Sequence, residues 1–169
     1  MSAPGPEGVS DALRPPSERV SPRARLMWIA VDGVRGLVVV VLLWFATGPW
    51  HWFDLPGWVL GVVGALLLAY AVLVPQWRYL VHRWEVTDTA VYTQSGWFDQ
   101  ERRIAPVSRI QTVDTERGPL EQLFGLSSVT VTTASAAGAL EIKGLDREVA
   151  DRLVDELTAA TQADAEDAT

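Results

Sequence analysis

The chain has 169 residues and a formal net charge of −7, yet 49% of its residues are hydrophobic and 21% are charged. This acidic balance excludes a generally basic nucleic-acid-binding surface. The absence of cysteine excludes disulfides, thiolate zinc sites and cysteine nucleophiles. The apolar residues are segregated, because Asp54 is the only formally charged residue between Arg35 and Arg78. A membrane element joined to one modest polar domain accounts for this composition.

The N-terminal region combines an irregular tail with a first apolar segment. Residues 1–22 are rich in Pro, Gly, Ser and charge, which predicts a disordered tail. The apolar segment covers residues 26–46, but its uncharged core, GLVVVVLLWFA, is too short to cross a bilayer. The span therefore includes Asp32 and Arg35, which lie three positions apart and can pair. We expect them at the inner headgroup boundary, with Arg35 snorkelling outward; an intramembrane ion-pair site is the alternative.

The second apolar segment, residues 58–74, carries no charge and ends at Pro75. Together the two segments predict a transmembrane hairpin of two helices over residues 23–75. Small residues repeat every four positions along the second helix, at Gly57, Gly61, Ala65 and Ala69. Such a stripe lets another helix approach closely. We expect the first helix to pack there through Gly33 and Gly36, with a second copy of the chain as the alternative.

The residues that flank the two spans predict their orientation. The connecting turn holds Trp50, Trp52 and Phe53 but no Arg or Lys, and such aromatic residues concentrate at membrane interfaces. His51 has no partner ligands nearby, so we interpret it as an interfacial residue rather than a metal or pH-sensing site. Arginines flank the opposite ends of the spans, at positions 14, 19, 23 and 25 and at positions 78 and 83. The positive-inside rule predicts a multi-pass plasma membrane protein with both termini in the cytoplasm.

From His82 onward, short β-rich runs separated by turn signals replace the apolar segments. We predict strands over residues 83–87, 90–95, 98–105, 110–116, 128–134 and 140–143. A helix is predicted over residues 146–161, where apolar residues repeat every four positions, and the acidic tail 162–169 is expected to fray. The pattern favours an α+β fold of antiparallel strands closed by one helix over residues 76–161. We expect this domain to fold on its own.

Four stretches carry a resemblance to a known family. They are WRYLVHRWEVT (77–87), IAPVSRIQTVD (104–114), GPLEQLFGLSSVTVTTA (118–134) and IKGL (142–145). In these stretches the chain resembles the bacterial pleckstrin-homology (PH) membrane proteins of the YdbS-like family. The resemblance implies two packed antiparallel sheets capped by a C-terminal helix, next to the membrane hairpin. It also implies, by analogy alone, a role in envelope maintenance or in resistance to membrane-active agents.

Several motif residues are candidates for interaction or for structure: Arg109, Gln111, Asp114, Gly118, Pro119, Leu120, Phe124 and Gly125. We expect Arg109, Gln111 and Val113 to share one face of a strand. Arg109 suits a phosphate, a partner's carboxylate or a structural ion pair. Gly118-Pro119 predicts a turn, after which Leu120, Leu123 and Phe124 are expected to plug one end of the core. Gly125 would allow a left-handed exit from that turn.

The function that these features favour is a non-enzymatic, membrane-anchored adaptor that binds a protein partner or assembles with itself. No phosphate-binding loop, dinucleotide fingerprint or metalloprotease motif is present, and no cofactor or metal is expected. The alternative is a module that senses anionic lipids through a patch of Arg78, Arg83, Arg102 and Arg103. Residues 75–169 oppose it, because they hold nine Lys and Arg against sixteen Asp and Glu. An unrecognised enzyme is the remote third possibility.

Overall fold

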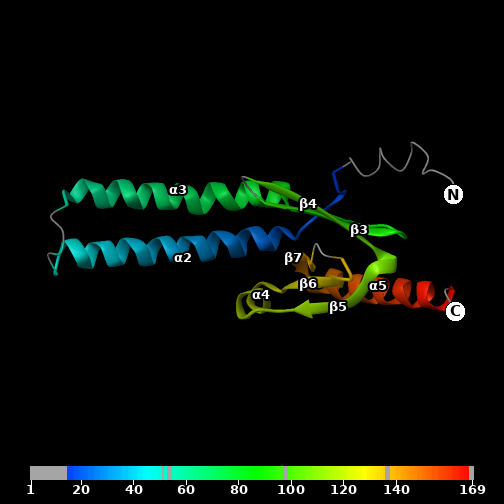
Figure 1. Cartoon of the computed structure of the whole chain (residues 1–169). Helices are drawn as coiled ribbons and strands as arrows, with labels where there is room; N and C mark the ends of the chain where they lie inside the picture. Colours follow the sequence, from blue (N-terminus) through cyan, green and yellow to red (C-terminus); the bar gives the residue numbers. More distant parts are fainter. Residues whose placement is uncertain (1–14, 51, 53–54, 97–98, 136–137, 168–169) are drawn as a thin grey trace.

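The computed structural model describes residues 15–50, 52, 55–96, 99–135 and 138–167. Two long helices, α2 (Pro22–Thr47) and α3 (Gly57–Val81), form an antiparallel hairpin that projects from an α+β body (Figure 1). Both helices are long and apolar enough to cross a membrane. The predicted hairpin is confirmed, and both helices extend beyond the apolar segments 26–46 and 58–74.

Aromatic residues mark where the two helices enter and leave the bilayer. Trp28 and Trp77 lie near the end of the hairpin that meets the α+β body, and Trp58 lies at the opposite end. The helical rise from Trp28 to Thr47, and likewise from Trp58 to Trp77, is about 29 Å at about 1.5 Å per residue. This matches the hydrocarbon thickness of a bilayer, about 30 Å. On the side of the α+β body, a stretch of bilayer length therefore ends at Trp28 in α2 and at Trp77 in α3.

The helices of the hairpin pack through Gly36, as expected, but through Gly64 of α3 rather than through the predicted stripe. A Cβ placed on Gly36 would lie 3.4 Å from the Cβ of Leu67, and one on Gly64 would lie 3.8 Å from Val40. By contrast, a Cβ on Gly33, Gly57 or Gly61 would meet nothing within 4 Å. The stripe formed by Gly57, Gly61, Ala65 and Ala69 is not buried. The expectation that this stripe packs against the first helix is wrong, and packing against a second copy stays a prediction.

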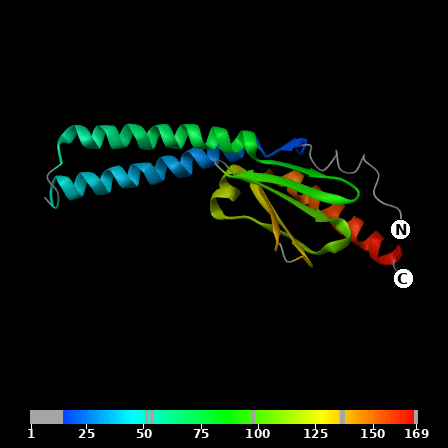
Figure 2. The ribbon, with the colours of Figure 1, turned by 45° about the horizontal axis from the view of Figure 1, so that its top comes forward.

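The α+β body consists of two antiparallel sheets and a C-terminal helix, which confirms the predicted fold class (Figure 2). The first sheet has the order β1 (Glu18–Arg19), β2 (Arg83–Val86), β3 (Ala90–Gly96) and β4 (Gln100–Pro106). The second has the order β5 (Ile110–Glu116), β6 (Leu126–Thr133) and β7 (Leu140–Asp146). A short 3-10 helix, η1 (Val107–Arg109), joins the sheets, and α4 (Pro119–Phe124) joins β5 to β6.

The closing helix α5 (Arg147–Asp167) packs its apolar stripe into the core between the sheets. Ala150, Leu153 and Leu157 are buried with Val129 and Val131 of β6. The helix starts one residue later than predicted and continues to Asp167. The prediction that the chain frays from residue 162 is therefore wrong up to Asp167.

The alternation of β5 is broken near its start. Its pairing with β6 shifts between Ile110 and Thr112, so Gln111 is an extra residue, as in a β-bulge. The bulge places Ile110 and Val113 together against the core, while Gln111 is exposed. Arg109 lies before the strand, in η1. The predicted shared face of Arg109, Gln111 and Val113 is therefore wrong.

The N-terminal segment is part of the α+β body rather than a disordered tail. Within residues 15–22, Glu18 and Arg19 pair with Trp84 and Arg83 of β2. Val20 is buried, together with Ala24, Trp28 and Leu126, in a second apolar cluster. The predicted tail over residues 1–22 is wrong for Glu18–Ser21, and residues 1–14 lie outside the described residues. A fragment that begins at residue 76 would lack three of these four buried residues, so independent folding of residues 76–161 is no longer expected.

The contact between α2 and β7 leaves no room for a side chain at Gly144. Gly144 has φ +74°, and a Cβ there would lie 2.7 Å from the Cβ of Ala24. Gly138 has a similar φ of +79°, but a Cβ there would meet nothing within 4 Å. Both glycines therefore have a left-handed backbone conformation, but only Gly144 lies against another element, the helix α2.

We predict that Gly144→Ala lowers the stability of the full-length protein more than Gly138→Ala does. The extra loss should be about 1–3 kcal/mol, the usual cost of overpacking. Thermal unfolding of both variants in detergent measures the difference. Equal melting temperatures would show that the approach of α2 to β7 is not tight.

Candidate functional site

The membrane boundary holds a compact cluster of aromatic and basic side chains. The guanidinium of Arg78 lies 4.2 Å from the ring centroid of Trp28, a cation–π geometry. The His82 ring lies 5.4 Å from the Trp28 ring, and its Nδ1 lies 2.9 Å from the carbonyl oxygen of Arg78. Since that carbonyl only accepts, Nδ1 carries the proton and Nε2 is the free acceptor in neutral His82. Arg78 thus links α2 to α3, and the cluster of Trp28, Arg78 and His82 is called the joint.

A second set of contacts ties the start of α2 to the end of β7. The Ser21 hydroxyl donates to Asp146 Oδ1 at 2.9 Å and accepts from the Arg23 amide, while Arg23 lies 3.6 Å from the same carboxylate. The Ser21 amide donates to the carbonyl of Gly144 at 2.9 Å. Sequence reasoning missed this role of Ser21. Its signal was present, because Ser21-Pro22 combines an N-cap residue with proline at the first helical position.

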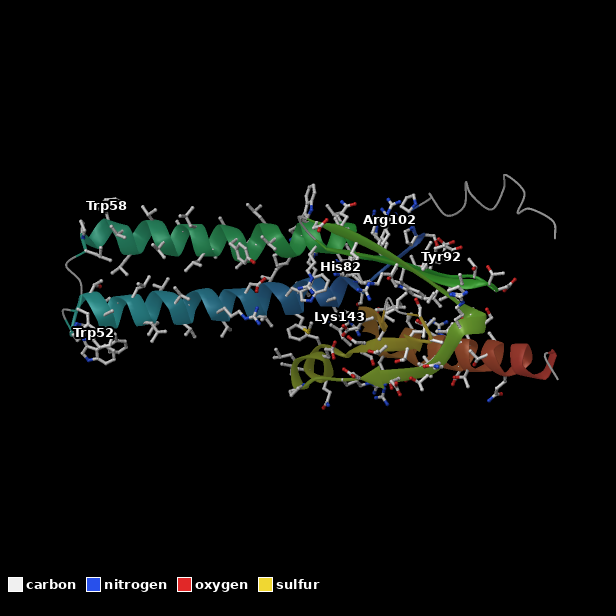
Figure 3. All side chains as sticks on the ribbon, in the orientation of Figure 1. Trp52, Trp58, His82, Tyr92, Arg102 and Lys143 are labelled. Carbon is white, nitrogen blue, oxygen red and sulfur yellow. The ribbon has the colours of Figure 1, made fainter. Side chains whose placement is uncertain are left out.

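Basic residues form a row across the first sheet. The strand register aligns Arg19 with Arg83, Arg83 with Gln94, and Gln94 with Arg102. Residues aligned in this way project from the same face of a sheet. Figure 3 shows Arg102 near the junction of the first sheet with the N-terminal segment. Arg83 follows His82, the residue after α3, so the basic row begins beside the end of the hairpin. It contains two of the four predicted patch residues.

The other basic residues line a groove of about 690 Å³ beside β4. Its lining includes Arg102, Arg103 and Arg109 together with the exposed Ile104. Arg103 is held in place, because its Nε lies 2.7 Å from Glu101 and its Nη1 donates to the carbonyl of Ala139 at 2.9 Å. Arg109 is exposed. The predicted patch is thus divided: Arg78 lies in the joint, Arg83 in the basic row and Arg103 in the groove, and only Arg102 belongs to both surfaces.

The motif around Gly118 is a capped turn of helix. Glu121 Oε2 accepts from the Gly118 amide at 2.9 Å, and its Oε1 accepts from the Ser128 hydroxyl at 2.7 Å. Gly125 ends α4 at φ +69°, the predicted left-handed exit. The expected core plug is wrong for Leu120 and Leu123, which are 49% and 77% exposed. Phe124 alone packs on the second apolar cluster.

Two predicted polar candidates make only local contacts. Asp114 accepts a hydrogen bond from the Thr112 hydroxyl at 3.1 Å on the exposed side of β5. In α2, the Arg35 guanidinium lies 3.4 Å from Asp32, which confirms their pairing. Arg35 lies about 10 Å past Trp28 along the helix, and its side chain is 76% exposed. The position of this pair at the inner headgroup boundary and its alternative role as an intramembrane ion-pair site both stay predictions.

Burial in the joint suppresses protonation of His82. Removal from solvent, together with the adjacent Arg78 guanidinium, lowers the pKa of His82 from 6.5 to about 4. The unfolded chain therefore takes up a proton between pH 6.5 and 4 while the folded protein does not. The folded state is destabilised as the pH falls through this window and is unaffected above pH 6.5.

We predict that His82→Gln makes the stability less sensitive to acid. At pH 5, protonation of His82 in the unfolded chain should cost wild-type protein about 2 kcal/mol relative to pH 7.5. The glutamine variant lacks that loss. Chemical unfolding in detergent at both pH values measures it. Parallel pH dependences of the two proteins would show that His82 is not buried in its neutral form.

Comparisons with known proteins agree with this architecture. The family model described as "Bacterial PH domain" matches residues 25–161. The UPF0699 transmembrane protein YdbS of Bacillus subtilis (strain 168) is 32% identical over 151 residues, which cover 85% of this chain and 91% of that protein. No solved structure matches significantly. The family match begins inside α2, in keeping with the contribution of that helix to the α+β body. The resemblance seen in the sequence is confirmed, and the chain belongs to the bacterial PH-domain family of transmembrane proteins.

Proposed function

We propose that the chain is a non-enzymatic, membrane-anchored adaptor whose PH-like domain binds a protein partner at the inner face of the plasma membrane. The hairpin holds the domain at the bilayer, and the groove beside β4 receives an extended segment of the partner. The observation that carries this proposal is the coincidence of that groove with the edge of a sheet. The family resemblance implies that this adaptor acts in envelope maintenance or in stress resistance.

The edge of β4 has the features of a strand-addition site. β4 is the last strand of its sheet, so its outer edge has no strand partner among the described residues. An extended peptide could add to such an edge by main-chain hydrogen bonds and place alternate side chains in the adjoining groove. Ile104, which is 51% exposed, offers an apolar contact there. This mode of binding needs no catalytic residue and no cofactor.

The charge of the groove selects the kind of partner. Its lining contains three arginines and one glutamate, although the domain as a whole is strongly acidic. An acidic segment would be attracted to the groove and repelled by the rest of the domain, which fixes where it binds. We therefore infer an extended partner segment that carries Asp or Glu.

Anionic-lipid binding is the second candidate, and the basic row of Arg19, Arg83 and Arg102 favours it. Juxtamembrane basic residues attract anionic headgroups by about 1 kcal/mol each near the surface. The row is interrupted by Gln94 and faces competition from acidic neighbours, since Glu85 accepts from the Ser17 amide close by. We therefore rank lipid sensing below protein binding.

The proposed orientation can be tested by reporter fusions. Fusions at residue 1 and residue 169 should both report the cytoplasm, and an insertion beside Asp54 should report the outside. The reason is that arginines flank the start of the first span and the end of the second, whereas the turn that connects the two spans has none. An extracytoplasmic C-terminus would exclude an adaptor at the inner face.

The groove can be tested by photocrosslinking in native membranes. A photoreactive residue at Ile104 should form protein adducts, whereas one at the exposed Thr115 of β5 should form few. Arg109→Glu should remove most of the Ile104 adduct, because it reverses a charge in the groove. Arg152→Glu, the same charge change on the exposed side of α5, should leave it intact.

Two results would contradict this assignment. Equal adducts at Ile104 and Thr115 would show that the groove is not a preferred contact. Absence of protein adducts, together with anionic lipid that co-purifies with wild-type protein but not with the Arg83→Ala, Arg102→Ala variant, would place lipid sensing first.

A further inference from the structure

The α+β body exposes large hydrophobic side chains at two places. Among the described residues that follow the hairpin, the exposed ones are Ile104 in the groove and Leu120 and Leu123 on α4. Leu123 is the more exposed of the α4 pair, at 77%. Both leucines belong to a helix of six residues that contributes only Phe124 to an apolar cluster. Something other than this domain must cover them if they are to leave water.

The helix α4 lies beside the start of α2. Phe124 packs on the cluster that contains Trp28, with Met27 against the same cluster. A Cβ on Gly125 would lie 3.4 Å from Nη1 of Arg23. Figures 1 and 2 both show α4 at the end of the body that faces the hairpin, projecting alongside α2.

This position places α4 at the level of the membrane boundary. Trp28 marks that boundary, because one hydrocarbon thickness separates it from the far end of α2. A helix packed on the cluster that contains Trp28 therefore lies at the level of the headgroup zone. On the neighbouring helix α2, Leu26 and Val34 are also exposed.

The outer surface of α4 is free of charge. Its only ionisable residue is Glu121, and both carboxylate oxygens are engaged within the domain, by the Gly118 amide and the Ser128 hydroxyl. The C-terminal end of the helix is also capped, since the Gly125 amide donates to the carbonyl of Gln122. A short helix with capped ends and no outward charge can enter the headgroup zone without burying an unpaired polar group.

We propose that α4 inserts Leu120 and Leu123 into the leaflet on the side of the α+β body. The lipid then contacts the protein at three elements: α2, α3 and the tip of α4. The short helix acts as an interfacial anchor, with its apolar side chains in the boundary between headgroups and acyl chains. This contact is independent of the partner proposed for the groove and of the side of the membrane on which the body lies.

The anchor also orients the domain. Leu126 and Asp146, at one end of the second sheet, contact the start of α2. Thr133 and Leu140, at the opposite ends of β6 and β7, line the groove. With α4 in the leaflet, that end of the groove faces away from the lipid.

Single-cysteine variants of the full-length protein test the anchor, because the natural chain has no cysteine. Leu123→Cys and Ile104→Cys are labelled with the same environment-sensitive fluorophore and reconstituted into phosphatidylcholine vesicles. Lipids with a doxyl quencher close to the headgroup should remove most of the emission at position 123 and little at position 104. Aqueous iodide should give the reverse order. Ile104 is the matched control, as an exposed apolar side chain outside the anchor.

A second measurement separates the anchor from an effect of the label. A fluorophore on Gln122→Cys should lose its quenching by doxyl lipid when Leu120 and Leu123 are both changed to Gln. Ile104→Gln should not alter it. Position 123 quenched by iodide as strongly as position 104 would overturn the proposal. Shielding of position 123 from both quenchers would also overturn it and would show that protein, not lipid, covers α4.

Discussion

The approach of α2 to β7 at Gly144 is the contact on which the rest of the molecule depends. The absence of a side chain at Gly144 lets Ala24 reach the backbone of β7. Ser21 and Asp146 then tie the two elements by hydrogen bonds, and Trp28 covers the start of the second sheet with Leu126. The N-terminal end of a membrane helix is therefore a structural part of the PH-like body.

The contact between α2 and β7 explains how a bilayer can fix the position of a small acidic domain. α3 runs into β2 through His82, while α2 is held at the opposite sheet, so both helices of the hairpin engage the body. Two attachments restrict rotation about the membrane normal, which a single flexible linker would allow. Arg83 of the basic row then lies beside the end of the hairpin, whereas Thr133 and Leu140 of the groove lie at the end of the second sheet away from α2.

The sequence predicted the elements well and their contacts less well. Apolar length identified α2 and α3, and a β-rich run bounded by turn signals identified β5 with its observed ends, because these signals are local. The prediction for the Gly57–Ala69 stripe was wrong because the way two helices cross decides which glycines face the other helix. Residue spacing alone does not determine that crossing. The short strand β1 was not predicted, because a strand of two residues shows no periodicity in the sequence. Leu120 and Leu123 were predicted to be core residues because a short apolar motif has the same sequence pattern whether its side chains are buried in the core or exposed on the surface.

Amide hydrogen exchange of full-length protein in nanodiscs tests most directly whether the N-terminal segment belongs to the domain. A chain that lacks residues 2–21 is compared with one that lacks residues 2–14, which retains every described contact of Val20 and Ser21. Loss of the longer segment should accelerate exchange in β6 and β7, where Leu126 and Gly144 meet that segment. Loss of the shorter one should leave β6 and β7 protected. Equal protection of these strands in both chains would contradict the view that the segment before α2 is part of the folded domain.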